Sequence, residues 1–331
     1  MTWAYVGFFL GAVVSLVTSW VLVTRLERVG ERLGLSEALL GIVAALAADA
    51  PEITSSVTAL SHHQRSIGAG VVIGSNVFNL AALLGLGAVV SGFIVLHRRV
   101  VVLGGVVAML IAFVCLATVL GGVSDVTGLT IAGVGFVAYL VVLVGRGQNV
   151  AGLVLKGRTR AWLASAIEEE EIELSDAIRP PRGTMADFLV AAGALVVVVM
   201  ASVAMERGAS TLGRHFYVAD AVIGAIVLAG VTSLPNAVAA IHLASKGRGA
   251  AALSTALNSN SLNVIAGLLI PGVFVGAARF SLSGSVVTWW YVGLTLVTLL
   301  FAYASRGLRR WQGGLIVLAY LAFVIALLIV V

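Results

Sequence analysis

Two acidic side chains lie in the middle of an otherwise apolar stretch. Asp49 and Glu52 stand three residues apart on either side of Pro51, within ALAADAPEITSSVTAL at 45–60. Residues at this spacing share one face of a helix, so both carboxylates can point into one cavity. Because a charged group at bilayer depth is costly, it marks a candidate functional site. Two carboxylates this close are also a natural proton carrier, since both cannot easily stay ionised in an empty site.

The same segment recurs later in the chain without its acidic residues. LAGVTSLPNAVAAIHL at 228–243 resembles it, and aligns Pro235 with Pro51 at a distance of 184 positions. The residues that replace the acidic pair are polar and uncharged: Ser233 and Asn236, with Thr232 beside them.

A second pair of segments matches at the same offset. These are VIGSNVFNLAALLGL at 72–86 and ALNSNSLNVIAGLLI at 256–270. In each copy a serine and an asparagine four residues apart share one helical face. One offset across two motifs indicates an internal duplication. The aligned polar residues are Ser75 with Ser259, Asn76 with Asn260, and Asn79 with Asn263.

These side chains offer carboxylate, amide and hydroxyl oxygens, and each proline frees one backbone carbonyl that a neighbour, water or an ion must satisfy. Such an all-oxygen set suits hard cations such as Ca²⁺, Na⁺ or Mg²⁺. The alternative for the serines and asparagines is that they only join helices by hydrogen bonds. The candidate cation ligands are Asp49, Glu52, Ser75, Asn79, Thr232, Ser233, Asn236, Ser259 and Asn263.

Composition identifies the elements that must position these residues. The 331 residues are 60% hydrophobic and 11% charged, whereas soluble domains carry about 25% charge. The chain is therefore predicted to be an all-α, polytopic membrane protein, with its basic excess in loops and not in a nucleic-acid site. A single cysteine, Cys115, excludes a disulfide framework. Ten apolar stretches could span the bilayer: about 2–24, 35–61, 67–92, 99–120, 126–145, 186–204, 218–244, 250–276, 284–304 and 311–331.

Five spans in each half make the two halves inverted repeats, a pattern typical of secondary transporters with interrupted helices. We expect a first repeat at 1–145 with its motifs in 45–86, a linker at 146–185, and a second repeat at 186–331 with its motifs in 228–270. The second and seventh helices should be broken at their prolines. The first stretch lacks a basic leader, so we interpret it as a retained helix and not as a cleaved signal.

The basic residues predict the orientation. With the N-terminus outside, the outer loops hold only Arg65, Arg207, Arg214 and Arg279 of the 20 basic residues, and the inner loops hold the rest. Both termini should then lie outside and the linker in the cytoplasm. That linker carries four consecutive glutamates at 168–171 and begins with LVLKGRTRAWLASAI, a possible surface helix. A solvated linker is favoured over a regulatory ion site.

On these motifs the chain resembles the cation/Ca²⁺ exchanger superfamily over nearly its whole length. That superfamily has ten spans in two inverted halves, with repeats close to G-T-S-L-P-E and G-S-N-I-F-N/D. TSLPN at 232–236 and GSNVFN at 74–79 match these repeats, and NSNSLN at 258–263 matches more loosely. The resemblance implies that Glu52 is the principal Ca²⁺ ligand. The supporting ligands that it implies are Asn79, Ser75, Thr232, Ser233 and Ser259.

The chain departs from this pattern at two informative places. Asn236 replaces the glutamate of the second repeat, and Asp49 stands where the superfamily has serine or threonine. Both carboxylates therefore belong to the first repeat. Together they carry a charge near −2, which matches one divalent cation and makes a stoichiometry of three Na⁺ doubtful.

These observations predict a secondary cation antiporter in the cytoplasmic membrane, exchanging Ca²⁺ for Na⁺ or H⁺ without a cofactor. The first and sixth helices would slide across a core of spans two, three, seven and eight. An exchanger for Mg²⁺, Mn²⁺ or Na⁺/H⁺ alone, and a transport-dead scaffold or sensor, remain alternatives. An intramembrane enzyme is disfavoured because no metalloprotease, Ser/Lys, Ser/His or aspartate-rich motif stands out. The expected partners are the lipid bilayer and inorganic cations, and the oligomeric state is left open.

Overall fold

The computed structural model describes residues 1–33, 37–144, 183–234, 236–237, 244, 249–275 and 282–330. Most of the predicted linker at 146–185, including its basic and acidic segments, lies outside these residues. In the first half the elements are α1 (Thr2–Arg32), α2 (Glu37–Ala48), α3 (Ala50–Ser61), α4 (Arg65–Asn79), the π-helical η1 (Leu80–Leu86), α5 (Gly87–Ser91), β1 (Phe93–Val95), α6 (Arg98–Val119) and α7 (Asp125–Val144).

The second half follows after the linker. Its elements are α10 (Met185–His215), α11 (Asp220–Val222), the π-helical η2 (Ile223–Leu228), α12 (Ala229–Thr232), α14 (Gly249–Leu262), the π-helical η3 (Asn263–Leu269), α15 (Ile270–Val275), α16 (Leu282–Ser305), β2 (Gly307–Arg309) and α17 (Arg310–Val330).

Eight helices in the described part of the chain are long and apolar enough to cross a membrane. They coincide with eight of the ten predicted spans, and the prediction of a polytopic helical membrane protein is confirmed. The other two are the spans predicted to be broken. The first consists of α2 and α3, of 12 residues each, which meet at Asp49. The second runs from Asp220 to Thr232 and turns at Ser233, and most of its remainder lies outside the described residues, so the count of ten stays a prediction.

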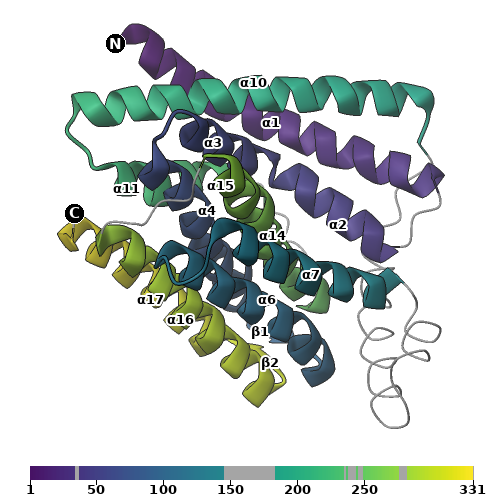
Figure 1. Ribbon diagram of the computed structural model, residues 1–331. Coiled ribbons are helices and arrows are strands. Elements are labelled where there is room, and N and C mark those ends of the chain that lie inside the picture. The colour runs from purple at the N-terminus through teal and green to yellow at the C-terminus, as the bar shows by residue number, and fades with distance from the viewer. Residues whose placement is uncertain are drawn as a thin grey trace.

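Two helices are longer than expected. The predicted spans 2–24 and 186–204 are wrong at their ends, because α1 and α10 each run for 31 residues. At 1.5 Å per residue each helix is about 46 Å long, well beyond the roughly 30 Å of a hydrocarbon core. The two lie side by side along one flank of the molecule, against α2 and α3 (Figure 1). Inside this pair the Ser15 and Ser202 hydroxyls hydrogen-bond at 2.8 Å.

The centre of the molecule is formed by α4 and η1, which are buried over almost their whole length. The helix α4 packs against η2 on one side and η3 on another. The close approach to η2 needs glycine, because a Cβ on Gly74 would collide with backbone atoms of Ala225, and one on Gly70 would lie 3.0 Å from the Ala225 nitrogen. These contacts bring the two sequence repeats together at the core.

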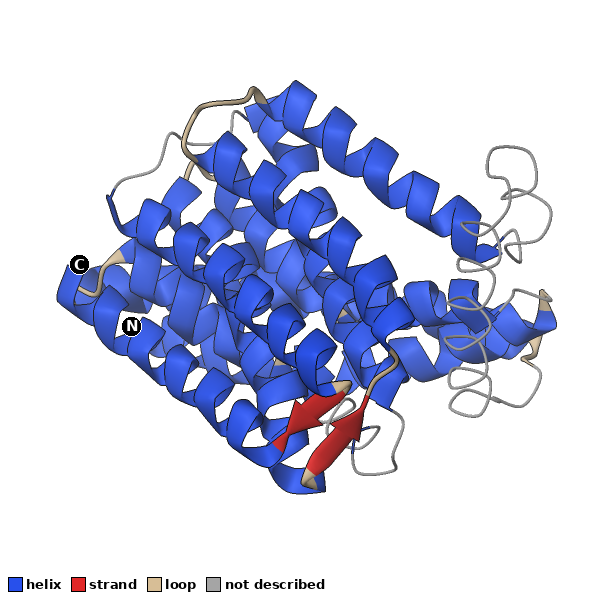
Figure 2. Cartoon of the chain, turned by 90° about the horizontal axis from the view of Figure 1, so that it is seen from below, coloured by secondary structure: helices blue, strands red, loops and turns tan. Residues whose placement is uncertain are grey.

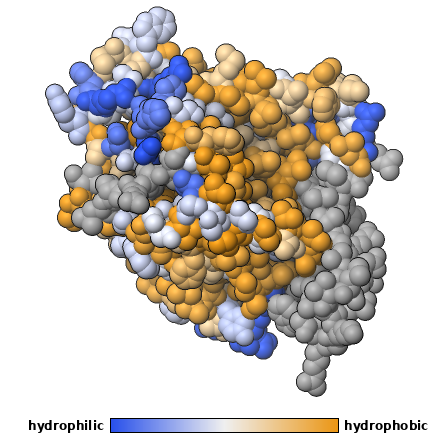
Figure 3. Space-filling model, in the orientation of Figure 1, coloured by the Kyte–Doolittle hydropathy of each residue, from blue (hydrophilic) through white to orange (hydrophobic). Residues whose placement is uncertain are grey.

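The outer helices carry apolar side chains on their exposed faces. Large hydrophobic residues such as Val106, Val134, Leu300 and Leu318 are more than half exposed on α6, α7, α16 and α17. The space-filling view shows hydrophobic surface over the middle of one face and hydrophilic clusters at its margins (Figure 3). A surface of this kind is suited to lipid and not to water.

Contacts near the ends of the helices join segments that the sequence predicts to lie on the same side. The two short strands, a small departure from the all-α prediction, pair antiparallel with Ile94 opposite Leu308 (Figure 2). They join two loops that the sequence places on the inner side. Arg25 of α1 pairs with Asp187 of α10 at 2.6 Å, again between two inner ends. His62, at the end of α3, lies 3.4 Å from Arg207 of α10, where the sequence predicts the outer side.

Candidate cation site

The break at Asp49 follows from the proline two residues later. Pro51 has no N–H, so the Ala47 carbonyl loses its helical donor. The Ser19 hydroxyl of α1 donates to this carbonyl at 3.3 Å. A freed carbonyl in an apolar setting is thereby satisfied by a neighbouring helix, one of the outcomes expected from the sequence.

The equivalent position in the second half has the same backbone. Asp49 has φ −80° and ψ −4°, and Ser233 has φ −84° and ψ −4°. Around each, the flanking main-chain hydrogen bonds recur with an offset of 184: Ile53 donates to Asp49 as Ala237 donates to Ser233. Pro235 itself lies outside the described residues. The duplication seen in the sequence therefore extends to the geometry of the turn.

The carboxylates of Asp49 and Glu52, both in the first half, are held by side chains of the second half. One Glu52 oxygen accepts from the Ser233 hydroxyl at 2.5 Å, and the other accepts from the Asn263 amide. The Asp49 Oδ1 atom accepts from the Asn236 amide and from the Ser259 hydroxyl, both at 2.7 Å. All four donors are neutral, so they orient the carboxylates without cancelling their charge.

An internal twofold relation connects these contacts. Shifting Glu52 and Ser233 by the repeat offset, in opposite directions, gives Asn236 and Asp49, and both pairs are in direct contact. The same relation holds for Asn76 and Asn260, because the side-chain amide of each donates to the main-chain carbonyl of the other, at 3.0 and 3.1 Å. The polar network is thus built around the pseudo-twofold axis.

The site is closed to solvent. None of the nine predicted ligands is more than 3% exposed. Among the described residues, seven buried side-chain oxygens or nitrogens lack a hydrogen-bond partner. Four of the seven belong to predicted ligands, and a site crowded with unpaired oxygens suits a cation. These four are Asp49 Oδ2, Ser75 Oγ, Asn79 Oδ1 and Asn263 Oδ1.

One predicted ligand is directed elsewhere. The Thr232 hydroxyl donates to the main-chain carbonyls of Leu228 and Ala229, at 2.9 and 3.3 Å, within its own helix. The other eight predicted ligands either join the network around the carboxylates or hold an unpaired oxygen.

Charge in the site is not balanced by basic side chains. The ion pairs seen between two described residues are those of Asp187 with Arg25 and Arg28. Asp49 and Glu52 are fully buried and have no such partner there. Buried charges need compensation, so a bound cation or protons must supply it.

Several polar residues near the site are absent from the predicted ligand set. Asn76 and Asn260 are buried and connect the two halves, and their alignment in the repeats was the available signal. Ser55 is also buried, with an unpaired hydroxyl three residues after Glu52. Farther away, Glu206 is 1% exposed in the part of α10 beyond the predicted span, where nothing in the apolar pattern marked it.

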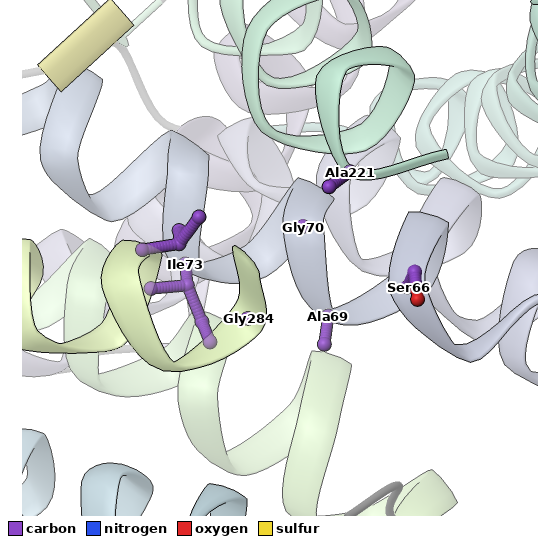
Figure 4. Close-up of a pocket in the computed structure, with 7 residues that line it drawn as sticks. Ser66, Ala69, Gly70, Ile73, Ala221 and Gly284 are labelled. Carbon is purple, nitrogen blue, oxygen red and sulfur yellow. The ribbon is translucent and has the colours of Figure 1, made fainter. Parts of the chain in front are cut away.

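A small crevice elsewhere in the molecule lacks the chemistry of this site. It lies where α4 passes α11 and α16, with a free volume of about 10 Å³ (Figure 4). Ser66 supplies its one side-chain hydroxyl, and the rest of its lining, including Ile73 and Ala221, is apolar or glycine. A space of this size is comparable to that of one water molecule.

Comparison with known proteins gives one consistent result. The family model described as "Sodium/calcium exchanger protein" matches residues 3–146 and 187–329. The sodium/calcium exchanger MaX1 of Methanosarcina acetivorans is 27% identical, and the match covers 96% of each chain.

Solved structures share the fold. The sodium-calcium exchanger NCX_Mj superposes with a TM-score of 0.57 at 21% identity, covering 98% of this chain and 99% of that one. The H⁺/Ca²⁺ exchanger CAX superposes with a TM-score of 0.66 at 13% identity, covering 99% of this chain and 86% of that one.

Proposed function

Because the chain belongs to the sodium/calcium exchanger protein family, a family of secondary transporters and not of enzymes, we propose that it is an antiporter that exchanges Ca²⁺ for Na⁺ or H⁺. The observation that carries the proposal is the closed site in which Asp49 and Glu52 are held by donors from the opposite repeat. The relatives named as Na⁺/Ca²⁺ and H⁺/Ca²⁺ exchangers support the choice of ions.

Charge balance supports a divalent substrate. Two carboxylates without a basic partner among the described residues carry two negative charges when ionised, and one Ca²⁺ neutralises both. Two protons, or two Na⁺ ions, would neutralise the same site after Ca²⁺ leaves. A third Na⁺ would leave an uncompensated positive charge in a buried site. We therefore propose an exchange in which the counter-ions carry two charges in total.

The ligands that we assign to the cation are those predicted from the sequence. Asp49 and Glu52 supply the charge, and amide and hydroxyl oxygens complete the set. The unpaired oxygens of Ser75, Asn79 and Asn263 support this assignment. The supporting ligands are Ser75, Asn79, Ser233, Asn236, Ser259 and Asn263, with Thr232 contributing only if its hydroxyl turns away from its own helix.

We propose that α1 and α10 move together to open the site to each side in turn. They contact each other along the flank that covers α2 and α3, and Arg25, Ser15 and Ser19 tie α1 to its neighbours. We place both chain termini outside the cytoplasmic membrane and the 146–185 linker inside. Five-helix repeats at 1–145 and 186–331 complete the proposed organisation.

Transport in reconstituted vesicles tests the proposal. Radioactive Ca²⁺ uptake should be driven by an outward Na⁺ gradient or by a pH gradient, and Glu52→Gln should abolish it because the site loses half its charge. Ser61→Ala, a substitution at the exposed end of α3, is the control and should transport normally. Undiminished Ca²⁺ uptake by Glu52→Gln would contradict the assignment of the cation site. Wild-type protein that moves only Mg²⁺, Mn²⁺ or Na⁺, or no ion, would support one of the alternatives instead.

A further inference from the structure

We infer that Asn76 and Asn260 are positioning residues: they fix the amide orientation of Asn79 and Asn263, so that these present carbonyl oxygen, and not NH₂, to the cation. The inference rests on the proposed function and deepens it. Asn76 and Asn260 are at most 1% exposed, and each hydrogen-bonds to the side chain of a predicted ligand, Asn263 and Asn79 respectively.

The argument starts from two groups whose polarity is fixed. A main-chain carbonyl can only accept a hydrogen bond. Asn260 contacts the Asn76 carbonyl at 3.1 Å, and Asn76 contacts the Asn260 carbonyl at 3.0 Å. Each of these side chains must therefore turn its NH₂ toward the opposite backbone, which leaves its Oδ1 atom on the other side.

The orientation of Asn76 and Asn260 determines the orientation of the two asparagines that they contact, Asn263 and Asn79. The Asn260 Oδ1 atom can only accept, so the Asn79 side chain must offer its NH₂, at 3.1 Å. By the same reasoning the Asn76 Oδ1 atom accepts from the Asn263 NH₂ at 3.4 Å. The Asn79 NH₂ also reaches the Ser259 hydroxyl at 3.2 Å, and the Asn263 NH₂ also reaches Glu52. The bonds to Ser259 and Glu52 are compatible with the orientation that the Asn260 and Asn76 oxygens require.

The end of each chain of hydrogen bonds is an unpaired oxygen. Asn79 Oδ1 and Asn263 Oδ1 are buried and have no partner among the described residues. Carbonyl oxygen is a ligand for Ca²⁺ and Na⁺, whereas an amide NH₂ repels them. A flip of either amide would replace a ligand by a donor. Asn76 and Asn260 therefore raise cation affinity without coordinating the cation.

Asn260 and Asn76 should differ in how much they raise cation affinity. Asn260 holds Asn79 at 3.1 Å, and Asn76 holds Asn263 at 3.4 Å. The other partner of Asn79 is the Ser259 hydroxyl, which can accept or donate, whereas the other partner of Asn263 is the Glu52 carboxylate, which accepts when ionised and fixes the amide by itself. Loss of Asn260 should therefore weaken cation binding more than loss of Asn76. Residues that orient metal ligands change affinity or activity by roughly 10- to 100-fold when replaced.

The experiment measures the KM for Ca²⁺ and the maximal rate in reconstituted vesicles. Asn260→Ala should raise KM by roughly 10- to 100-fold with a smaller change in maximal rate, and Asn76→Ala should raise it less. The matched control is Asn258→Ala on the same helix, because the bond of Asn258 among the described residues is local, to Ser254 at 3.1 Å. The KM of this variant should stay at the wild-type value. The same order should appear in detergent, in the Ca²⁺ concentration needed to raise the melting temperature.

A second background separates positioning from a purely structural role. Asn79→Ala removes the amide that Asn260 orients, without adding a third carboxylate to the site. In this background Asn260→Ala should change KM by less than about twofold. An equal rise of KM in both backgrounds, or an unchanged KM in Asn260→Ala alone, overturns the inference while the proposed function stands. Absence of Ca²⁺ transport and Ca²⁺ stabilisation in the wild-type protein overturns both. If Asn260→Ala does not fold, Asn260→Leu replaces it, because leucine has a similar size and can neither donate to the Asn76 carbonyl nor accept from Asn79.

Discussion

The contact between Asp49 and Asn236 is related to the contact between Ser233 and Glu52 by the internal twofold relation. In the first contact the residue after the break is neutral and the residue at the break carries the charge, and in the second contact the charge is on the residue after the break. The atoms of Asp49 and Asn236 approach to 2.7 Å, and those of the corresponding pair to 2.5 Å. Because the backbone at Asp49 matches that at Ser233, serine should fit at 49. Glutamate at 236 would then meet that serine as Glu52 meets Ser233.

The double variant Asp49→Ser with Asn236→Glu should therefore retain Ca²⁺ transport, since it moves one carboxylate across the contact and keeps the site charge. Asp49→Ser alone should lower Ca²⁺ uptake by roughly 100-fold, because half of the compensating charge is lost. Asn236→Glu alone should also fail, since it places a third carboxylate directly beside Asp49. Initial rates of Ca²⁺ uptake compare the four proteins.

A double variant no faster than Asp49→Ser would mean that the two ends of this contact are not interchangeable. Protein yield and elution on a sizing column serve as the control for folding. The contact of Asp49 with Ser259 is lost in the double variant, so full wild-type rate is not expected.

At this scale the sequence allows the charged residues to be predicted but not their orientation. Asp49 and Glu52 are visible because acidic residues are rare in apolar stretches, and their partners are visible through the repeat. The direction of an amide depends on which backbone carbonyl it faces, and that is a property of packing between distant segments. The Thr232 hydroxyl, by contrast, bonds within its own helix, an alternative that threonine has in any helix, so the residue type alone does not distinguish this bond from cation binding.

At the scale of elements, helix contacts depend on glycines where the repeats meet. A Cβ on Gly74 would meet main-chain atoms of Ala225, which cannot move aside as a flexible side chain can. The helix α4 therefore approaches η2 as closely as two backbones without an intervening side chain can. The positions of Ser75 and Asn79, which follow Gly74 on α4, depend on this close approach.

Gly74→Ala should destabilise the protein by roughly 1–3 kcal/mol, the usual cost of overpacking a core. Gly133→Ala is the matched control, because nothing lies within 4 Å of a Cβ there and alanine favours a helix. Melting temperatures measured by fluorescence-detected size exclusion should fall for the first variant and stay equal or rise for the second. Equal melting temperatures for the two variants would contradict the packing argument.

Element lengths are less predictable than element identity. Apolar content locates the membrane spans. The helices α1 and α10 extend beyond their apolar stretches because polar residues in these extensions are bonded to other segments. Arg25 and Arg28 meet Asp187 at one end, where Asp187 also forms a capping box with Thr184. At the other end Glu206 lies beside Gln64, whose amide reaches it at 2.8 Å. These partners come from distant parts of the chain, so a local pattern cannot reveal them.

At the scale of the whole molecule, contacts between loops divide the ends of the helices into two groups, one on each side. The β1 and β2 strands belong to one group, together with Arg25 and Asp187. His62 and Arg207 belong to the other, as do Arg65 and the Val275 carbonyl, 3.4 Å apart. From the distribution of positive charge in the sequence, we propose that the first group faces the cytoplasm.

Cysteine labelling tests this assignment, because Cys115 is buried and is the single cysteine of the chain. In a Cys115→Ala background, Tyr217→Cys should react with a membrane-impermeant maleimide in intact cells, since Tyr217 is 96% exposed at the proposed outer end of α10. Arg309→Cys should react only after the cells are opened. The reverse pattern would invert the orientation, and equal labelling of both in intact cells would contradict the ten-span count.

The placement of both carboxylates in one repeat has a consequence for the transport cycle. In a transporter built from inverted repeats, the inward-facing and outward-facing forms arise when the two halves exchange conformations. Identical halves would make the two empty forms equal in energy. Among the nine predicted ligands, the two ionisable ones, Asp49 and Glu52, both belong to the first half. We therefore expect the two empty forms to differ in energy, so that one of them predominates. The cation concentration that half-saturates the protein will therefore differ between the two faces of the membrane.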